Sequence, residues 1–211
     1  MESGDYLAIG SAVMPAVPNV TALRKSAVHG KIQEPLTKPA HLKPIVKDGI
    51  KIDPMRKGVE KLFGKQAYID NDILDAAVND VFTNLGTKKT PPVVHTYEEA
   101  IVGVEGDPYK RSLNRTTSPG YPYNLKNPGK GKSHWLGKDQ EFDLTNEQLR
   151  KDTQDLIEKA KKGIRGDAIF MATLKDEKRP NEKVDAGKTR VFEACPQHLA
   201  IALRQYFLDR L

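Results

Sequence analysis

Cysteine is almost absent from this chain of 211 residues, which contains Cys195 and no other. A single cysteine cannot form a disulfide within the chain, which excludes a disulfide-stabilised secreted domain. Long apolar runs are also missing, since none approaches the roughly 18 residues that a membrane-spanning helix needs. The chain begins Met-Glu-Ser-Gly-Asp, whereas a secretory signal begins with basic residues followed by an apolar stretch. We therefore expect an intracellular protein without a membrane span.

Complete motifs for zinc binding, nucleophilic catalysis or P-loop binding are missing as well. Cys195 and His198 form one Cys-x-x-His pair, and the other four histidines are scattered singly, which supports neither a zinc site nor a cysteine nucleophile. Residues 131–133 and 187–189 read Gly-Lys-Ser and Gly-Lys-Thr, but a lysine and a glutamate replace the first glycine that a P-loop requires. We expect Cys195 to be a core cysteine at the end of a strand.

Acidic residues are outnumbered, 28 against 34 basic ones, which gives a formal net charge of +6. With 38% hydrophobic and 29% charged residues, the chain has enough apolar material for a core and is not fully disordered. Residues 108–138 contain no acid at all. A basic excess of this size indicates a polyanionic partner. The cations of the acid-free stretch are Lys110, Arg111, Arg115, Lys126, Lys130, Lys132 and Lys138.

Proline punctuates the amino-terminal quarter of the chain. Six of the 14 prolines lie at or before Pro54, and they exclude long helices and central strands there. Apolar residues are regularly interspersed between Leu23 and Val46. We therefore expect an extended arm that lies across another surface.

Two segments show the apolar spacing of amphipathic helices. Residues 70–85 carry apolar side chains at helical intervals, and Gly86 stands where a C-terminal cap is expected. A second helix is predicted to begin at a capping box formed by Thr145 and Gln148 and to end near Gly163.

The remaining pattern predicts a mixed α+β fold. Residues 97–102 suit one or two helical turns, and a helix with Pro196 in its first turn runs to the end of the chain. Between them, the apolar run 168–174 and the alternating run 188–194 predict two strands.

A charged loop, residues 174–190, joins these two predicted strands. Lys188 and Arg190 are two residues apart, so on a strand they would project to the same face. Arginine forks and lysine point charges suit the phosphates of a triphosphate. The alternative is a solvated hairpin in which the acids of the loop neutralise its cations in weak surface pairs. The cations are Lys175, Lys178, Arg179, Lys183, Lys188 and Arg190, and the acids are Asp176, Glu177, Glu182 and Asp185.

A second segment, which we call the hydroxyl loop, covers residues 116–123 and reads Thr-Thr-Ser-Pro-Gly-Tyr-Pro-Tyr. Its hydroxyls and backbone N–H groups could contact a phosphodiester backbone, with a tyrosine nearby for a sugar or base. It could equally be a tight turn packed by its tyrosines.

In order and separation, the two segments resemble motifs G and F of the RNA-dependent RNA polymerases of picornavirus-like positive-strand RNA viruses. The hydroxyl loop resembles motif G, and the charged loop resembles motif F, ending in Gly-Lys-Thr-Arg. Residues 30–35, 39–42 and 53–59 resemble the amino-terminal region of the insect-virus branch, the dicistroviruses and iflaviruses. The resemblance covers most of the chain from about residue 21.

The resemblance implies an α+β fold that is the fingers portion of a right-hand polymerase, with palm and thumb absent. It implies a tail or polyprotein linker at 1–20, an extended arm at 21–67, fingers at 68–195, and the start of a helix leading to the palm at 196–211. Triphosphate contacts are then expected from Lys175, Arg179, Lys183, Lys188 and Arg190. Template contacts are expected from Thr117, Ser118, Gly120 and Tyr121, and RNA backbone contacts from Lys126, Lys130 and Lys132.

The resemblance places catalysis outside this chain. The two Mg²⁺ ions of such polymerases are held by palm carboxylates, and no Gly-Asp-Asp occurs here. Asp70, Asp75 and Asp80 are spaced by five, but five helical steps turn such residues roughly 140° apart. Asp48 and Asp53 share that spacing but lie in the proline-rich arm. No metal ligand and no catalytic residue are therefore expected in this fragment, which alone should be inactive.

The expected partners are an RNA template and primer, nucleoside triphosphates, and the palm and thumb of the same polyprotein. The expected location is the host cell cytoplasm, at viral replication complexes. A non-enzymatic RNA-binding module is the alternative, and a structural or partner-binding protein is a third possibility. A self-sufficient module should unfold cooperatively, whereas a severed fingers fragment should expose apolar surface.

Overall fold

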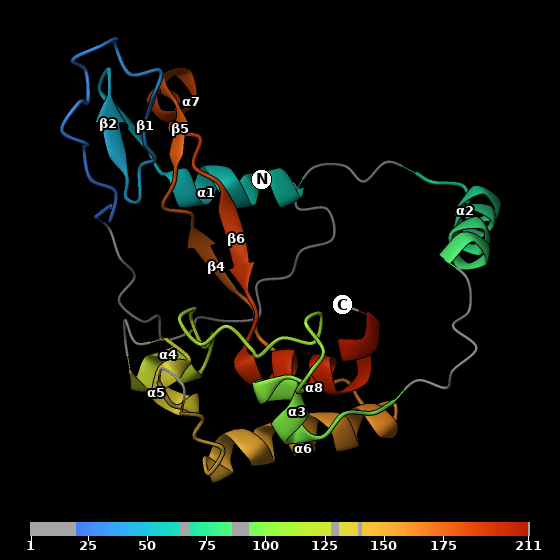
Figure 1. Cartoon of the computed structure of the whole chain (residues 1–211). Helices are drawn as coiled ribbons and strands as arrows, with labels where there is room; N and C mark the ends of the chain where they lie inside the picture. The colour runs from blue at the N-terminus through green and yellow to red at the C-terminus, as the bar shows by residue number, and fades with distance from the viewer. Residues whose placement is uncertain (1–19, 64–67, 86–92, 128–130, 139–140, 211) are drawn as a thin grey trace.

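The structure, a computed structural model, describes residues 20–63, 68–85, 93–127, 131–138 and 141–210. It has two main parts (Figure 1). The first, which we call the strand unit, contains the short strands and two short helices. The second, the helix unit, contains most of the helical residues. One antiparallel strand pair runs from the strand unit down to the helix unit (Figure 1). The mixed α+β fold predicted from the sequence is present.

Strands in the described residues pair two by two, always antiparallel. The first pair joins the amino-terminal arm to the charged loop, with Lys38 opposite Arg179. This part of the arm therefore pairs with a segment about 140 residues later in the chain. The pairs are β1 (Thr37–Pro39) with β5 (Lys178–Pro180), β2 (Ile45–Lys47) with β3 (Ile50–Ile52), and β4 (Met171–Leu174) with β6 (Val191–Ala194).

The β2–β3 hairpin adds regular structure to the arm that the proline pattern does not predict. Its turn is Asp48-Gly49, and both residues have positive φ, 51° and 76°. Two successive positive φ values are the requirement of a type I′ turn, for which Asp-Gly is a favoured sequence. The signal was thus present in the sequence, between two short apolar runs.

The charged loop is more than a hairpin between β4 and β6. It contains β5 and the short helix α7 (Asn181–Asp185). Strand β6 begins at Val191, three residues later than the alternation predicts. Two of the residues before it bond elsewhere: the Thr189 hydroxyl donates to the His41 carbonyl at 2.7 Å, and the Lys188 N–H donates to the Lys183 carbonyl at 2.9 Å.

The helix unit encloses the main apolar core. The capping box of α3 (Tyr97–Val102) is formed by Thr96 and Glu99. The N-cap of α6 (Glu147–Lys161) is Asn146, whose side chain accepts from the Leu149 N–H. Thr145 instead donates from its N–H and its hydroxyl to the Asp143 carboxylate. The predicted Thr145 capping box is therefore wrong by one residue. The helices are α3 (Tyr97–Val102), α4 (Tyr123–Lys126), α5 (Ser133–Leu136), α6 (Glu147–Lys161) and α8 (Gln197–Phe207), with a 3-10 turn at Leu208–Arg210; the core is Tyr97, Ala100, Ile101, Tyr123, Trp135, Leu136, Leu149 and Ile201.

Two further helices follow the arm. Helix α1 (Pro54–Val59) is capped by Asp53, continues into a 3-10 turn at Glu60–Phe63, and packs on β4 and β6. Helix α2 (Asn71–Leu85) confirms the first predicted helix. It stands apart from both units (Figure 1), and its side chains from Asn71 to Asn84 are exposed. The predicted cap at Gly86 lies outside the described residues. Among those residues, no helix has the length and apolarity to cross a bilayer.

The hydroxyl loop and the end of β6 meet at a tight backbone junction. The Gln197 N–H donates to the Pro119 carbonyl at 2.9 Å. Gly120 has φ +73°, and a Cβ there would lie 2.6 Å from the Cys195 carbonyl oxygen and from the Pro196 Cα. Only glycine fits such an approach at positive φ. Cys195 lies directly after β6, at the strand end where its sequence context predicts it.

Gly120→Ala should destabilise the protein by about 3 kcal/mol or more. A non-glycine residue at positive φ costs about 1–2 kcal/mol, and the collision with the Cys195–Pro196 backbone adds to this cost. Gly106→Ala is the matched control, because Gly106 has φ +79° with no atom within 4 Å of the added Cβ. Urea unfolding of both variants measures the difference. Equal losses of stability in the two would contradict the role of the junction.

Candidate phosphate and nucleic-acid binding site

Glu177 gathers three cations of the charged loop. Arg190, which precedes β6, donates to it from Nε at 2.6 Å and also from Nη2. Arg179 on β5 lies 3.4 Å away through Nη1, and the Lys175 ammonium lies 3.7 Å away. The Glu177 side chain is only 13% exposed. One sheltered carboxylate thus holds residues from three parts of the loop in a fixed arrangement.

This cluster carries a surplus of positive charge. The hydrogen bonds from Arg190 lower the pKa of Glu177 from 4.5 to about 2, with a smaller contribution from Arg179. The same carboxylate raises the pKa of Arg190. Three cations face one anion, and the side chains of Arg190 and Lys175 remain 57% and 49% exposed. The cluster can therefore accept a further anion on its solvent side.

Two predicted triphosphate residues stand outside this cluster. Lys183 lies on α7 and faces Glu182 at 3.5 Å. Lys188 is exposed, and among the described residues it has no ion pair. The structure thus brings together Lys175, Arg179 and Arg190, and it leaves Lys183 and Lys188 on the neighbouring turn.

Glu177 and Glu182 pair with cations of the charged loop, as the solvated-hairpin alternative expects, whereas the two aspartates of the loop bond to the arm. Asp185 pairs with Lys38 of the arm, and both side chains are about half exposed. Such surface pairs contribute little. Asp176 holds the start of the arm, accepting from the Thr21 hydroxyl and the Ala22 N–H, both at 2.6 Å. The sequence offered no signal that distinguished Glu177 and Asp176 from the other acids.

The hydroxyl loop presents some of its predicted residues and buries another. Thr117 and Ser118 are exposed, and Tyr121 is half-buried. Gly120 is buried at the junction with Cys195 and Pro196. The backbone there faces the protein, and the template contact predicted at this residue stays a prediction. Gly120 fixes the loop that carries the two exposed residues.

Lys132 holds the hydroxyl loop from behind. It is 8% exposed, and its ammonium donates to the Thr117 hydroxyl at 2.5 Å and to the Ser118 carbonyl at 2.7 Å. Burial lowers the pKa of this ammonium. The ammonium is thus occupied by acceptors of the protein itself, and the direct contact of Lys132 with RNA stays a prediction.

Two further basic residues of the acid-free stretch differ in exposure: Arg115 bonds to the protein, and Lys126 faces solvent. Arg115 donates to the carbonyls of Leu136 and Glu141 at 3.1 and 2.6 Å and lies over the Phe142 ring at 3.7 Å. It therefore has a packing role. Lys126 is exposed at the end of α4, and Lys130 lies outside the described residues.

Metal-ligating side chains do not converge in the described ranges, where no group of three or more His, Cys, Asp or Glu residues is placed to hold an ion. The aspartates with the five-residue spacing have local roles. Asp48 forms the β2–β3 turn, Asp53 caps α1, and Asp70 accepts from the Asp72 N–H at the start of α2. These residues do not fit the carboxylate pair that a two-metal site needs.

Glu177→Gln should destabilise the protein in a pH-dependent manner. Because folding lowers the pKa of Glu177 from 4.5 to about 2, its stabilisation is fully present above pH 4.5 and is lost as the pH falls through 2. The difference in urea midpoint between wild type and variant should therefore be constant from pH 7 to about 5.5 and shrink below pH 4.5.

The control for this measurement is Glu193→Gln. Glu193 is an exposed residue of β6 with no ion pair among the described residues. Its replacement should change the midpoint little at any pH. A Glu177→Gln effect that stays constant down to pH 2.5 would contradict the assigned ion-pair cluster.

Comparison with known proteins places the chain in a family. Residues 30–210 match the family model described as viral RNA-dependent RNA polymerase. The chain is 41% identical to the replicase polyprotein of cricket paralysis virus and 39% identical to that of Drosophila C virus, covering 97% of this chain and 12% of each relative. These similarities agree with the predicted likeness to the insect-virus branch.

A solved structure shows the same fold. The sicinivirus 3Dpol RNA-dependent RNA polymerase superposes with a TM-score of 0.74 at 25% identity, covering 95% of this chain and 40% of that chain. The chain thus spans less than half of the polymerase it resembles and about an eighth of the replicase polyproteins. By the extent of the family match and by its identity to these replicases, the chain belongs to the viral RNA-dependent RNA polymerase family.

Proposed function

We propose that this chain is the fingers portion of a viral RNA-dependent RNA polymerase and that it guides the template and admits nucleoside triphosphates. The observation that carries the proposal is the Glu177 cluster: two arginines and a lysine held by one sheltered carboxylate, with the outer cations exposed. Such fixed cations bind phosphate oxygens without changing protonation state.

The template surface is assigned to the hydroxyl loop. Thr117 and Ser118 are exposed residues. Lys132 fixes them by donating to the Thr117 hydroxyl and the Ser118 carbonyl, and the Gly120 junction fixes the loop. Hydroxyl and backbone groups of this kind position a nucleic-acid strand through its phosphates without reading its sequence. The two proposed surfaces share one scaffold, because β6 leads from Arg190 to the junction that holds the hydroxyl loop.

In the proposed reaction, a nucleotide is transferred from a triphosphate to an RNA 3′ end with release of pyrophosphate. Arg190, Arg179 and Lys175 would hold the triphosphate and balance the negative charge that develops on the leaving phosphates. The Mg²⁺ ions of the family would supply activation of the attacking hydroxyl. The described residues do not fit a site for them, so we derive no step through the metals from this chain.

Exposed apolar faces support the proposal that this chain works as part of a longer protein. An apolar groove of about 410 Å³ runs between α6 and α8, with Leu203 and Phe207 at 45% and 52% exposure. Phe82 on α2 is 69% exposed. Apolar patches of this extent usually mark contact surfaces. A self-sufficient RNA-binding module, the alternative, gives no reason for them.

Arg190→Gln in the full-length protein should raise the triphosphate KM and lower kcat, with kcat/KM falling about 10-fold to 100-fold. The expected loss corresponds to charge-assisted hydrogen bonds of about 1.5–3 kcal/mol. Arg190→Lys keeps the charge but loses the planar fork of the guanidinium, so its kcat/KM should lie between those of wild type and Arg190→Gln. Primer extension at varied triphosphate concentration provides the measurement.

Thermal unfolding accompanies this assay, because Arg190 also binds Glu177. The matched control is Lys51→Gln, an exposed cation of β3 remote in sequence from the charged loop. An unchanged kcat/KM in a folded Arg190→Gln protein would remove Arg190 from the triphosphate site and with it the main support for the proposal.

Lys132→Met should weaken RNA binding several-fold without changing its salt dependence. The substitution keeps the buried apolar volume but removes the donors that order Thr117 and Ser118. Because Lys132 makes no phosphate contact in this proposal, the slope of log K against log salt should be unaffected. Lys126→Met, at an exposed cation, is the comparison. If Lys132→Met reduced the slope by about 0.7, Lys132 would be a direct phosphate contact.

A further inference from the structure

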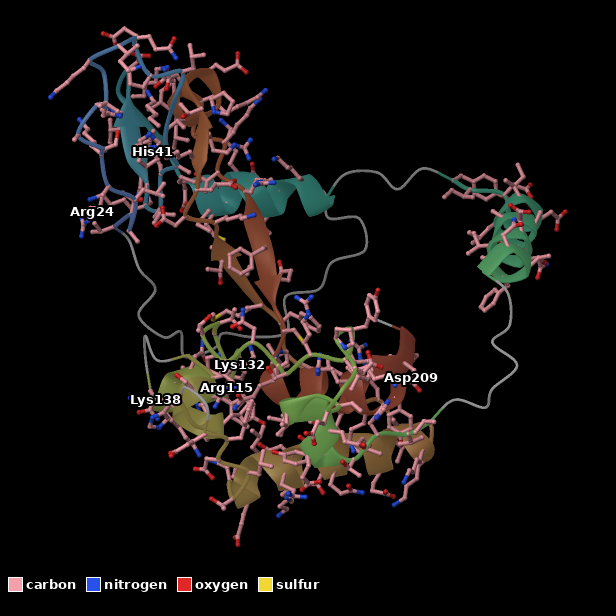
Figure 2. All side chains as sticks on the ribbon, viewed as in Figure 1. Arg24, His41, Arg115, Lys132, Lys138 and Asp209 are labelled. Atoms are coloured by element: carbon pink, nitrogen blue, oxygen red, sulfur yellow. The ribbon has the colours of Figure 1, made fainter. Side chains whose placement is uncertain are left out.

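A basic cavity of about 620 Å³ lies between the amino-terminal arm and the charged loop, apart from the Glu177 cluster. The arm contributes most of its lining, and the charged loop closes the other side; Arg24 marks the arm side in Figure 2. The lining residues that matter here are Arg24, Lys25, His29, Lys38, Lys178 and Asp185.

The walls of this cavity are fixed by contacts between segments far apart in the sequence. Asp176 holds Thr21 and Ala22 at the beginning of the arm. Further along, the Asn181 side chain donates to the Pro35 carbonyl at 2.7 Å, and β1 pairs with β5. The arm is therefore tied to the charged loop on both sides of residues 24–29, and the cavity is part of the folded architecture.

The charge of the cavity is positive and largely unneutralised. Its one lining acid, Asp185, is paired with Lys38. Among the described residues, Arg24, Lys25 and Lys178 have no ion pair. This differs from the Glu177 cluster, where one carboxylate pairs with both arginines and neutralises part of their charge. Unpaired cations that line a concavity favour an anion there.

Strand β5 separates the two basic sites. Successive residues of a strand face opposite sides. Arg179 contacts Glu177 in the proposed triphosphate cluster, whereas the preceding Lys178 lines the cavity. The charged loop can thus serve two anions at once, one on each side of the strand.

The lining chemistry points to a chain of phosphates. No Phe, Tyr or Trp side chain lines the cavity, and His29 carries the one aromatic ring among its described lining residues, so the cavity lacks the series of aromatic rings on which successive bases stack. The cations stand on both walls, with Arg24 and Lys25 on the arm and Lys178 on the loop. A nucleotide held alone would need contacts to its base, while a strand backbone needs only repeated positive charge.

We propose that this cavity binds the sugar-phosphate backbone of an RNA strand, at a site distinct from both the triphosphate cluster and the hydroxyl loop. The choice of RNA as the polyanion rests on the proposed function. The site contributes affinity mainly through phosphates, because repeated positive charge on both walls suits a strand backbone.

The test compares two double variants of the full-length protein, binding a fluorescent single-stranded RNA oligonucleotide at several salt concentrations. Arg24→Gln with Lys25→Gln removes two exposed cations of the cavity. Lys43→Gln with Lys51→Gln removes two exposed cations of the same unit that do not line it. The cavity variant should lose about tenfold in affinity, and its salt slope should fall by about 1.4, from two lost contacts of 0.7 each. The control should change less than twofold.

A second measurement separates this inference from the proposed function. Triphosphate KM should be unchanged in the cavity variant and in Lys178→Gln. An oligonucleotide containing 4-thiouridine should crosslink to a peptide within residues 21–39. Equal RNA affinity in the two double variants, or crosslinks confined to residues 115–133, would overturn the cavity site while leaving the proposed function intact. A raised triphosphate KM in the cavity variant would make it a triphosphate site instead. Absence of RNA binding by wild type would refute both.

Discussion

The approach of Gly120 to the Cys195–Pro196 backbone is the constraint on which both proposed surfaces depend. It locks the hydroxyl loop to the end of β6, while the start of β6 follows Arg190 and the Glu177 cluster. Four strand residues span about 13 Å. The separation between the two surfaces is therefore set by the length of β6, which is held straight by its pairing with β4. A shift at the junction would move the exposed residues of the loop relative to the exposed cations. Geometry of this kind matters in a polymerase because template and incoming nucleotide must meet in register.

Two neighbouring acids of the charged loop, Asp176 and Glu177, have different roles. Glu177 is sheltered and arranges three cations, which explains its low pKa and leaves the cluster positive. Asp176 is exposed and holds the arm, so it contributes position and little charge to the site. The outcome is one loop with a compact, partly neutralised cluster on one side and a wider, unneutralised cavity on the other. A strongly basic loop therefore remains ordered without cancelling its attraction for phosphates.

Burial changes the meaning of a basic residue. In the acid-free stretch, Lys132 and Arg115 donate hydrogen bonds to carbonyl and hydroxyl oxygens of the protein, whereas Lys126 stays exposed. A buried ammonium needs such partners because removal from water is costly. Membership of the viral RNA-dependent RNA polymerase family gives the arrangement its context: the lysine stabilises the loop that is proposed to guide RNA, and the neighbouring exposed groups are the ones proposed to contact the RNA.

The sequence by itself determined the features that depend on local pattern. Apolar periodicity located α2 and α6, and the order of the hydroxyl and charged loops identified the family, because both signals are written in short stretches of chain. Asp48-Gly49 also specified its hairpin, within a proline-rich segment. Only the tertiary structure decided that β1 pairs with β5, that Glu177 rather than another acid gathers the cations, and that Lys132 turns inward. These outcomes depend on which distant segments meet and on what they remove from water, and no local pattern of residues encodes either.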